Sequence, residues 1–470
     1  IACKWQISLY NTEKVKTPDI LKKINTMYCI HPDRFCKVGK VNEEVIEGRV
    51  YHSSFDEEVV YLPNEKGIVE NNDFFGGNIS GIISRLDYLE SLGVNAIYHL
   101  PILKSLTNHR YDTLDYKEVD PLLGTIEDYK RLCDEAHKRN MIIVFDGVFD
   151  HVSSKSKYSN LFWYVNGKRL NWWNDESLAQ LDLKREEVQE LICDVLRYWK
   201  NIGVDVLRVD VADEFPNELL ERMNEIMGVV IGEVWEDATT KFDSKYGTGR
   251  REFFNNGDKL NSLMNYPFRK AIIEYVRYKN SEFFKEQINH ILDHYPKEVN
   301  CVLMNFLSTH DRERILTKLV GKEMPDFENV YRVSGSKIAE VQKRQWEYDN
   351  DKLSGEQLKL GIKLEKIAYI IAAFLPGFPC IFYGDEVGLT GYIDPFCRKP
   401  YPYGKENLEL LEFYKSIGNL LKENSFIKEA SFSIKECTDN FLYMEYKSNN
   451  ENLVVMLNNS PKVIKISEDK

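Results

Sequence analysis

The chain has 470 residues, of which 43% are hydrophobic and 29% are charged, proportions typical of a globular protein with one large core and smaller attached domains. Its formal net charge of −12 argues against a nucleic-acid partner, because phosphate binding needs a basic surface. The acidic balance, and the lack of any apolar run near the roughly 20 residues of a membrane span, also argue against a membrane partner.

Short apolar runs alternate with longer amphipathic ones, a pattern typical of a parallel sheet covered by helices. In chain order, the expected strands are Met27–His31, Val94–Leu100, Met141–Asp146, Val204–Val209, Val229–Glu233, Leu260–Asn265, Cys301–Leu307 and Pro379–Tyr383. The expected helices include Ile79–Leu92, Ile126–Asn140, Arg185–Asn201, Pro216–Met227 and Leu364–Phe374. Eight strand–helix repeats predict an α/β fold, a (β/α)8 TIM barrel with its active site at the carboxyl ends of the strands.

Three segments depart from this repeat. Residues 150–182 follow the third strand and are rich in aromatic residues, which indicates a small excursion subdomain that walls the cleft. Residues 319–361 are highly charged and predict a helical insertion on the surface, whereas 423–470 alternate in the manner of strands and predict a short C-terminal β-domain. Residues 1–24 are interpreted as an N-terminal extension, and 25–422 as the barrel domain with its excursion and insertion.

The fourth and fifth expected strands carry a suggestive set of charges. Arg208 and Asp210 are two residues apart, so on a strand they project from the same face. Glu233 lies near the end of the next strand. A pair of carboxylates at neighbouring strand ends is what cleavage of a glycosidic bond requires.

Other strand ends contribute further polar residues. His109 and Tyr111 follow the second strand, Asp146 and His151 end the third, and His310 and Asp311 end the seventh. Because parallel strands of a barrel end at the same mouth, these side chains are expected to converge on one pocket. Any single one could be an ion-paired loop residue, but so many acidic groups together would repel one another unless the pocket used them.

These motifs, in this order, resemble the α-amylase family (glycoside hydrolase family thirteen). The matching segments are Tyr28-Cys-Ile-His-Pro-Asp-Arg-Phe35, Asp146–His151, Gly203–Asp213, Gly232-Glu-Val-Trp235 and Ser308-Thr-His-Asp311. The segments typical of its neopullulanase and cyclomaltodextrinase branch are Phe74–Gly81, Asn108–Thr113, Pro376–Glu386 and Asp394–Arg398. The resemblance covers the chain from Met27 to about Tyr403.

The resemblance implies three catalytic residues. Asp210 would be the nucleophile that forms a covalent glycosyl-enzyme intermediate, and Glu233 the acid that protonates the leaving oxygen and then activates water. Asp311 would bind hydroxyls of the reacting sugar and help to distort its ring.

It also implies roles for the neighbours of these residues. Arg208 would hold Asp210 ionised, and Asp146 would position the site from behind. His151 and His310 would donate hydrogen bonds to the sugar, Tyr111 would stack under the ring, and His109 would complete the substrate-binding set.

The function implied is retaining hydrolysis of α-1,4-linked glucans or maltodextrins, with hydrolysis and transglycosylation left open because both use the same intermediate. The alternative is a non-catalytic interaction protein on the same barrel, which would tolerate loss of the nucleophile or the acid. A barrel enzyme for phosphorylated metabolites is a third option, but the Tyr383-Gly-Asp-Glu386 loop is acidic and would repel phosphate. The exact glucan and the oligomeric state are left open.

No organic cofactor is expected, and no metal ligand is assigned to the site. Asp150 and Asp182 stand where the branch usually has Asn, so we hypothesise a Ca²⁺ site formed by them together with Glu214; the alternative is that each simply replaces an amide. Nine cysteines without close clusters indicate reduced thiols and a cytoplasmic protein. The first residues, Ile1-Ala-Cys3, leave a secreted or lipid-anchored protein as the alternative.

Overall fold

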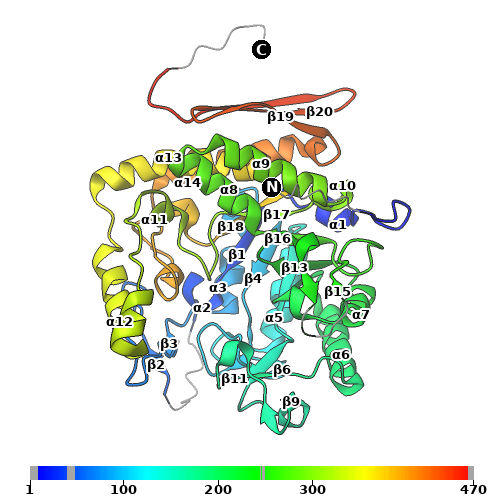
Figure 1. The fold of residues 1–470 in the computed structure, drawn as a ribbon, viewed down its shortest axis with the longest axis vertical. Helices are drawn as coiled ribbons and strands as arrows, with labels where there is room; N and C mark the ends of the chain where they lie inside the picture. Colours follow the sequence, from blue (N-terminus) through cyan, green and yellow to red (C-terminus); the bar gives the residue numbers. More distant parts are fainter. Residues whose placement is uncertain (1–8, 40–47, 244, 246–248, 464–470) are drawn as a thin grey trace.

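The computed structural model describes residues 9–39, 48–243, 245 and 249–463, and its centre is a barrel of eight parallel strands (Figure 1). In pairing order these are β1 (Met27–Ile30), β18 (Phe378–Phe382), β17 (Met304–Phe306), β16 (Ser262–Asn265), β13 (Val230–Val234), β12 (Val206–Val209), β7 (Ile142–Gly147) and β4 (Ala96–His99). Each overlaps a strand expected from the sequence, so the predicted (β/α)8 barrel is confirmed. The strands are buried along their whole length, which explains their nearly continuous apolar runs.

The register of β12 and β13 brings their acidic ends level. Val209 of β12 pairs with Gly232 of β13 in parallel register. Asp210 and Glu233 each follow by one residue, so both leave the barrel at the same height. Gly232 lets the Leu260 side chain pack closely against β13, because a Cβ there would lie 2.6 Å from Cδ1 of Leu260.

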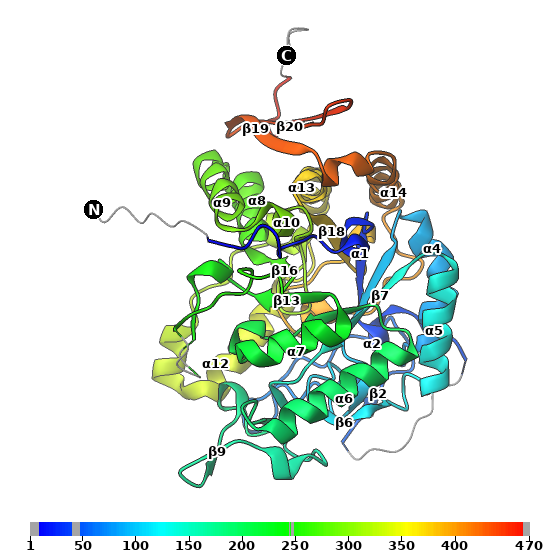
Figure 2. The ribbon, with the colours of Figure 1, turned by 90° about the vertical axis from the view of Figure 1, so that its right-hand side faces the viewer.

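An outer layer of helices covers the barrel (Figure 2). The longer helices are α3 (Ile79–Ser84), α4 (Leu86–Ser91), α5 (Ile126–Lys138), α6 (Glu186–Ile202), α7 (Asn217–Met227), α8 (Tyr266–Tyr278), α9 (Ser281–His294), α11 (Ile315–Val320), α12 (Glu328–Asn350), α13 (Gly355–Phe374) and α14 (Leu408–Glu423). Single-turn helices are α1 (Asp19–Lys22), α2 (Pro32–Phe35) and α10 (Lys297–Asn300).

Two helices differ from the expected ones. The single helix expected over 79–92 is interrupted at Arg85, whose backbone leaves the helical region (φ −105°, ψ 4°) and whose N–H donates to the Ile82 carbonyl at 3.0 Å. Helix α13 starts nine residues before the expected Leu364. It begins there because Ser354 and Gln357 form a reciprocal capping box that satisfies the first free N–H groups.

The excursion after β7 contains two short strand pairs. The first joins β8 (His151–Ser153) to β11 (Leu178–Gln180), and the second joins β9 (Tyr164–Val165) to β10 (Lys168–Arg169). Further short pairs lie in the loops of the barrel: β2 (Val50–Tyr51) with β3 (Asp73–Phe74), β5 (Leu103–Ser105) with β6 (Thr113–Val119), and β14 (Phe242–Asp243) with β15 (Gly249–Arg250).

A three-stranded antiparallel sheet forms the C-terminal end of the described chain and lies beyond α9 at the top of Figure 1. Its strands are β19 (Ser431–Thr438), β20 (Phe441–Lys447) and β21 (Asn452–Asn458). The expected C-terminal β-structure is therefore present. Asn459 anchors it to the barrel domain by donating from Nδ2 to the Tyr275 carbonyl at 3.1 Å.

The charged insertion forms the long helix α12, one face of which is buried. Ala339 and Glu347 are fully buried, and Arg344 is nearly so. The helix packs on the loop between β2 and β3, where Tyr348 stacks on Tyr61 with ring centroids 4.7 Å apart. Its charges are tolerated because they pair with one another: Nη1 of Arg344 donates to Oε2 of Glu347 at 2.9 Å.

Within the described part of the chain, no helix combines the length and the apolar character needed to cross a bilayer. The eight cysteines in that part are all free thiols.

Candidate active site

The guanidinium of Arg208 lies at the centre of the strand-end cluster. Its Nη1 donates to Oδ1 of Asp146 and to Oδ1 of Asp210, both at 2.7 Å, and its Nη2 lies 2.8 Å from Oε2 of Glu233. All four side chains are buried. Three carboxylates therefore share one cation in a region of low dielectric, where they cannot all be ionised without strong mutual repulsion.

Burial dominates the protonation of the two carboxyls expected to be catalytic. It raises the pKa of Asp210 well above its ordinary value, and the Arg208 charge offsets this only in part. The ion pair expected to hold Asp210 ionised is present, but it does not outweigh desolvation. Burial acts to raise the pKa of Glu233 too, yet Arg208 and hydrogen bonds from Trp235 and Val211 lower it overall. Without substrate, a proton shared by the two groups is therefore favoured on Asp210 over Glu233.

Glu233 is held by three donors. Nε1 of Trp235 donates to its Oε1 at 2.9 Å, the Tyr266 hydroxyl donates to the same oxygen at 3.1 Å, and the backbone N–H of Val211 donates to Oε2 at 3.1 Å. Val211 adopts φ +43°, a left-handed conformation that a β-branched residue rarely takes. This strained turn directly follows Asp210 and aims the Val211 N–H at Glu233, a local cost of about 1–3 kcal/mol of the kind that clusters at functional sites.

Asp146 contacts Arg208 and two tyrosines behind the cleft lining. Its Oδ2 accepts hydrogen bonds from the Tyr98 hydroxyl at 2.7 Å and the Tyr111 hydroxyl at 2.9 Å. The Tyr111 hydroxyl also lies 2.7 Å from Nε2 of His310, and the two rings stack with centroids 5.2 Å apart. Tyr111 therefore reaches Asp146 with its hydroxyl while its ring forms part of the cleft wall.

Asp311 lies between a histidine and an arginine. Its Oδ2 is 3.1 Å from Nε2 of His310, and its Oδ1 is 3.5 Å from Nη2 of Arg398. Burial and the nearby Glu233 charge raise the pKa of Asp311 to about 7, against the opposing effect of Arg398. Asp311 can therefore carry a proton or a charge near neutral pH.

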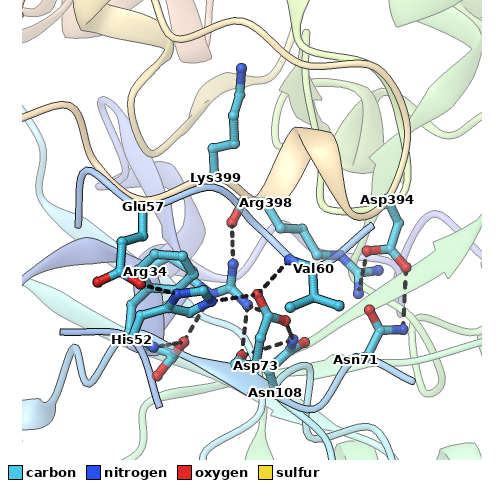
Figure 3. A network of polar contacts seen from close by, with 12 residues as sticks. Arg34, His52, Glu57, Val60, Asn71, Asp73, Asn108, Asp394, Arg398 and Lys399 are labelled. Atoms are coloured by element: carbon cyan, nitrogen blue, oxygen red, sulfur yellow. Dashed lines mark hydrogen bonds and ion pairs between the residues drawn. The ribbon is translucent and has the colours of Figure 1, made fainter. Parts of the chain in front are cut away.

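A second polar network connects this arginine to the loop between β2 and β3 (Figure 3). Arg398 Nη1 lies 3.2 Å from Oδ1 of Asp394, whose Oδ2 accepts from Nδ2 of Asn71 at 3.5 Å. The Arg398 carbonyl accepts from Nη1 of Arg34 at 3.2 Å, and Arg34 Nη2 donates to Asp73 Oδ1 at 3.2 Å. The network fixes the loop and Arg398 relative to one another, and through Arg398 it reaches Asp311.

A cleft of about 700 Å³ opens over these groups. Seven of the nine residues expected from the sequence line it: His109, Tyr111, His151, Asp210, Glu233, His310 and Asp311. The other two, Arg208 and Asp146, lie behind this lining and contact Asp210 and Tyr111, respectively.

Aromatic rings form two walls of the cleft. Trp172 stacks on His151 with centroids 4.8 Å apart, and Trp173, which is 73% exposed, stacks on Trp172 at 5.2 Å. Trp235 stacks on Tyr266 at 5.2 Å. Two rings of the excursion, Trp172 and Trp173, therefore line the cleft, and that of Trp173 presents an exposed aromatic face.

The lining residues that received no role from the sequence include Arg344, Asp394 and Arg398. The Asp394–Arg398 segment could have suggested two of them. Arg344 comes from the insertion, and no local pattern marks it among the many charges of α12.

Two of the three residues hypothesised to bind Ca²⁺, Asp150 and Glu214, contact a lysine. Nζ of Lys245 lies 2.6 Å from Oδ1 of Asp150 and 3.3 Å from Oε2 of Glu214. Burial acts to raise the pKa of Asp150, but His151 and Lys245 lower it to about 2. Asp182 does not join this group; its Oδ1 accepts from a backbone N–H two residues further on, at 3.3 Å.

The chain matches the family model "Alpha amylase, catalytic domain" over residues 29–173 and 154–348, and it therefore belongs to the α-amylase family of glycoside hydrolases. It is 29% identical over 501 residues to an amylopullulanase of Thermoanaerobacter thermohydrosulfuricus, covering 90% of this chain and 31% of that protein. It is 28% identical over 471 residues to a cyclomaltodextrinase of Thermoanaerobacter pseudethanolicus, covering 93% of this chain and 70% of that protein. The chain thus spans less than a third of the amylopullulanase. The cyclomaltodextrinase match confirms the neopullulanase and cyclomaltodextrinase branch expected from the motifs.

Among solved structures, a cyclic α-maltosyl-(1→6)-maltose hydrolase from Arthrobacter globiformis superposes with a TM-score of 0.74 at 22% identity. The match covers 94% of this chain and 92% of that one. This likeness agrees with the barrel fold.

Proposed function

We propose that the chain hydrolyses α-1,4-glucosidic bonds in maltodextrins or related glucans with retention of configuration. The observation that carries the proposal is the arrangement of two carboxyls, Asp210 and Glu233, which end neighbouring strands at the same height and contact one buried guanidinium, that of Arg208. Glycosidic cleavage uses such a pair of carboxyls, and we assign the two-step route with Asp210 as the internal nucleophile.

In the first step, a carboxylate oxygen of Asp210 attacks the anomeric carbon while the carboxyl proton of Glu233 passes to the glycosidic oxygen. The bond to the leaving sugar breaks, and a glycosyl ester forms on Asp210. In the second step, Glu233 takes a proton from water, the water oxygen bonds to the anomeric carbon, and the ester bond to Asp210 breaks. A sugar hydroxyl in place of that water gives transglycosylation.

The first step requires a particular protonation state of the two carboxyls. Attack needs Asp210 ionised and Glu233 protonated, whereas burial favours the proton on Asp210 in the empty site. Sugar hydroxyls that donate to Asp210 would stabilise its charged form and move the proton to Glu233. Substrate binding then prepares the acid as well as the nucleophile.

We propose that the cluster formed by Asp150 and Glu214 needs no calcium, because Lys245 supplies the positive charge between these two carboxylates. Chelator and added CaCl₂ should both leave the melting temperature unchanged. A rise in melting temperature with calcium would contradict this proposal.

The free cysteines support a reducing, cytoplasmic location.

The function is tested by incubating the protein with maltoheptaose, pullulan, β-cyclodextrin and starch, identifying the products, and recording by NMR which anomer forms first. A retaining enzyme releases the α-anomer. An initial β-anomer would refute the double displacement.

Asp210→Asn should remove nearly all turnover. Asp213→Asn is the matched control, because this cleft aspartate pairs with Lys241 at 2.8 Å and lies outside the Arg208 cluster; it should stay within about tenfold of the wild type. Full activity in Asp210→Asn would refute the mechanism. A wild-type chain inactive on every glucan would favour the interaction-protein alternative.

A further inference from the structure

A second cluster of chemically active side chains lies outside the catalytic machinery. His290 and His294 are four residues apart near the end of α9, so they share one face of the helix. Asp237 faces them from the loop that leaves β13, four residues after Glu233. Neither the expected catalytic set nor the cleft lining includes these three residues.

A ring nitrogen of each histidine contacts the same carboxylate oxygen, Oδ2 of Asp237. Nδ1 of His294 is in close contact with Oδ2 of Asp237, and Nε2 of His290 lies 3.3 Å from the same oxygen. The two imidazole centroids are 3.8 Å apart. In the described part of the chain, this is the one group of three His, Cys, Asp or Glu residues whose ligand atoms all lie within 4.8 Å of one another.

The carboxylate is oriented by its own surroundings. Oδ1 of Asp237 accepts from the backbone N–H of Thr239 at 2.9 Å and from its hydroxyl at 2.7 Å, which directs Oδ2 at the imidazoles. The Tyr295 hydroxyl accepts from the Ala238 N–H at 2.9 Å and fixes the same loop to the residue after α9. Outer contacts of this kind, which hold a ligand carboxylate in one orientation, accompany protein metal sites.

Burial and access also suit a bound ion. Asp237 and His294 are nearly buried, whereas the side chain of His290 is 44% exposed and leaves a path from solvent. A cavity of about 220 Å³ adjoins His294, Ala238 and Thr239, enough room for a water molecule as a further ligand.

We propose that Asp237, His290 and His294 bind a zinc ion, with water completing its coordination. Two neutral imidazoles and one carboxylate are donors that Zn²⁺ favours, whereas Ca²⁺ and Mg²⁺ prefer oxygen ligands alone. The ion would tie the β13 loop to α9. Because that loop starts at the catalytic strand end, zinc would stabilise the part of the chain that carries Glu233.

The test uses the full chain with any affinity tag removed and with metals stripped by chelator. Titration with ZnCl₂ should raise the melting temperature and saturate near one ion per chain by elemental analysis. Co²⁺ in its place should give visible absorption bands in the range typical of nitrogen and oxygen ligands. CaCl₂ should have no such effect.

His290→Gln should weaken zinc binding by at least about tenfold and abolish the zinc-dependent rise. The matched control is His137→Gln, because His137 is also a helix histidine, its side chain is 40% exposed, and its Nε2 lies 2.8 Å from a carboxylate, that of Asp205. This control should respond to zinc as the wild type does. The proposal is wrong if zinc leaves the wild type unchanged, or if His290→Gln and Asp237→Asn bind zinc as tightly as the wild type.

Discussion

Glu386 should make the protein lose stability as the pH rises, and Glu386→Gln should remove that loss. The side chain is completely buried, and its Oε1 accepts from the hydroxyls of Tyr28 and Tyr88, both at 2.7 Å. Burial raises its pKa from 4.5 to about 7, although the two tyrosine hydrogen bonds act in the opposite direction.

The sign follows from proton binding. The native carboxyl binds its proton more tightly than the unfolded one does, so unfolding releases a proton between pH 4.5 and about 7, and the free energy of unfolding falls as the pH rises through this window. A difference of about 2.5 pKa units corresponds to roughly 3 kcal/mol in full. Between pH 5 and pH 8 the loss due to Glu386 should be about 2–3 kcal/mol.

The assay is urea unfolding at pH 5 and pH 8, followed by tryptophan fluorescence, with equal m-values required of the two proteins. The amide also changes the hydrogen bond that the Gly384 N–H donates to Oε2 at 2.9 Å. That cost is the same at both pH values and cancels when the wild-type minus variant differences are compared. From pH 5 to pH 8, the free energy of unfolding of Glu386→Gln should rise by about 2–3 kcal/mol relative to that of the wild type. Identical differences at the two pH values would show that native Glu386 is already ionised at pH 5, and the reasoning would fail.

Arg208→Lys should lower kcat/KM on maltoheptaose by about 10²–10³, because an ammonium cannot contact three carboxylates in the guanidinium's planar geometry; a loss below tenfold would mean that the shared cation matters little. Lys245→Met should reduce the free energy of unfolding at pH 7 by about 3 kcal/mol, since it removes the lysine cation that pairs with the buried Asp150; urea unfolding measures this, and an unchanged midpoint would contradict it. Trp173→Ala should raise KM up to about tenfold for long glucans while leaving kcat on maltotriose unchanged, because it removes only an exposed stacking surface; a loss of kcat would instead give the ring a part in the chemistry.

The barrel could be predicted because strand and helix periods are strong local signals, and all eight strands form where the apolar runs indicate. The boundaries that differ depend on contacts that periodicity does not encode. The break at Arg85 depends on a turn closed by a backbone hydrogen bond, with the guanidinium over the Tyr88 ring at 4.0 Å. The early start of α13 was legible in principle, since Ser354 and Gln357 have the spacing of a capping box.

Site residues at the carboxyl ends of the barrel strands could be predicted from the sequence. Asp210, Glu233 and Asp311 were expected to converge because parallel strands of a barrel end at one mouth, and all three line the same cleft. The contact between Lys245 and Asp150 could not be predicted in this way, since the two residues are 95 positions apart and the lysine lies on a loop outside the strand–helix repeat. The protonation of Asp210 was also out of reach, because the balance between desolvation and an ion pair depends on burial that only the folded chain defines.

The charges around the cleft bear on which substrates can enter. Eight carboxylates line it against three permanent cations. The carboxylates are Asp175, Asp210, Asp213, Glu214, Glu233, Glu236, Asp311 and Asp394, and the cations are Lys241, Arg344 and Arg398. All three cations are engaged: Arg398 contacts Asp311 and Asp394, Lys241 contacts Asp213 and Glu236, and Arg344 contacts Glu347. A phosphorylated sugar would therefore meet a surplus of negative charge, whereas a neutral glucan brings hydroxyl donors that the carboxylates can accept. Burial is the main reason that Asp210 is hard to ionise in the empty site, and the charges of Glu233 and Asp146 add to it. A ligand that donates hydrogen bonds to these carboxylates would therefore be favoured, and an anionic one would be disfavoured before any specific contact forms.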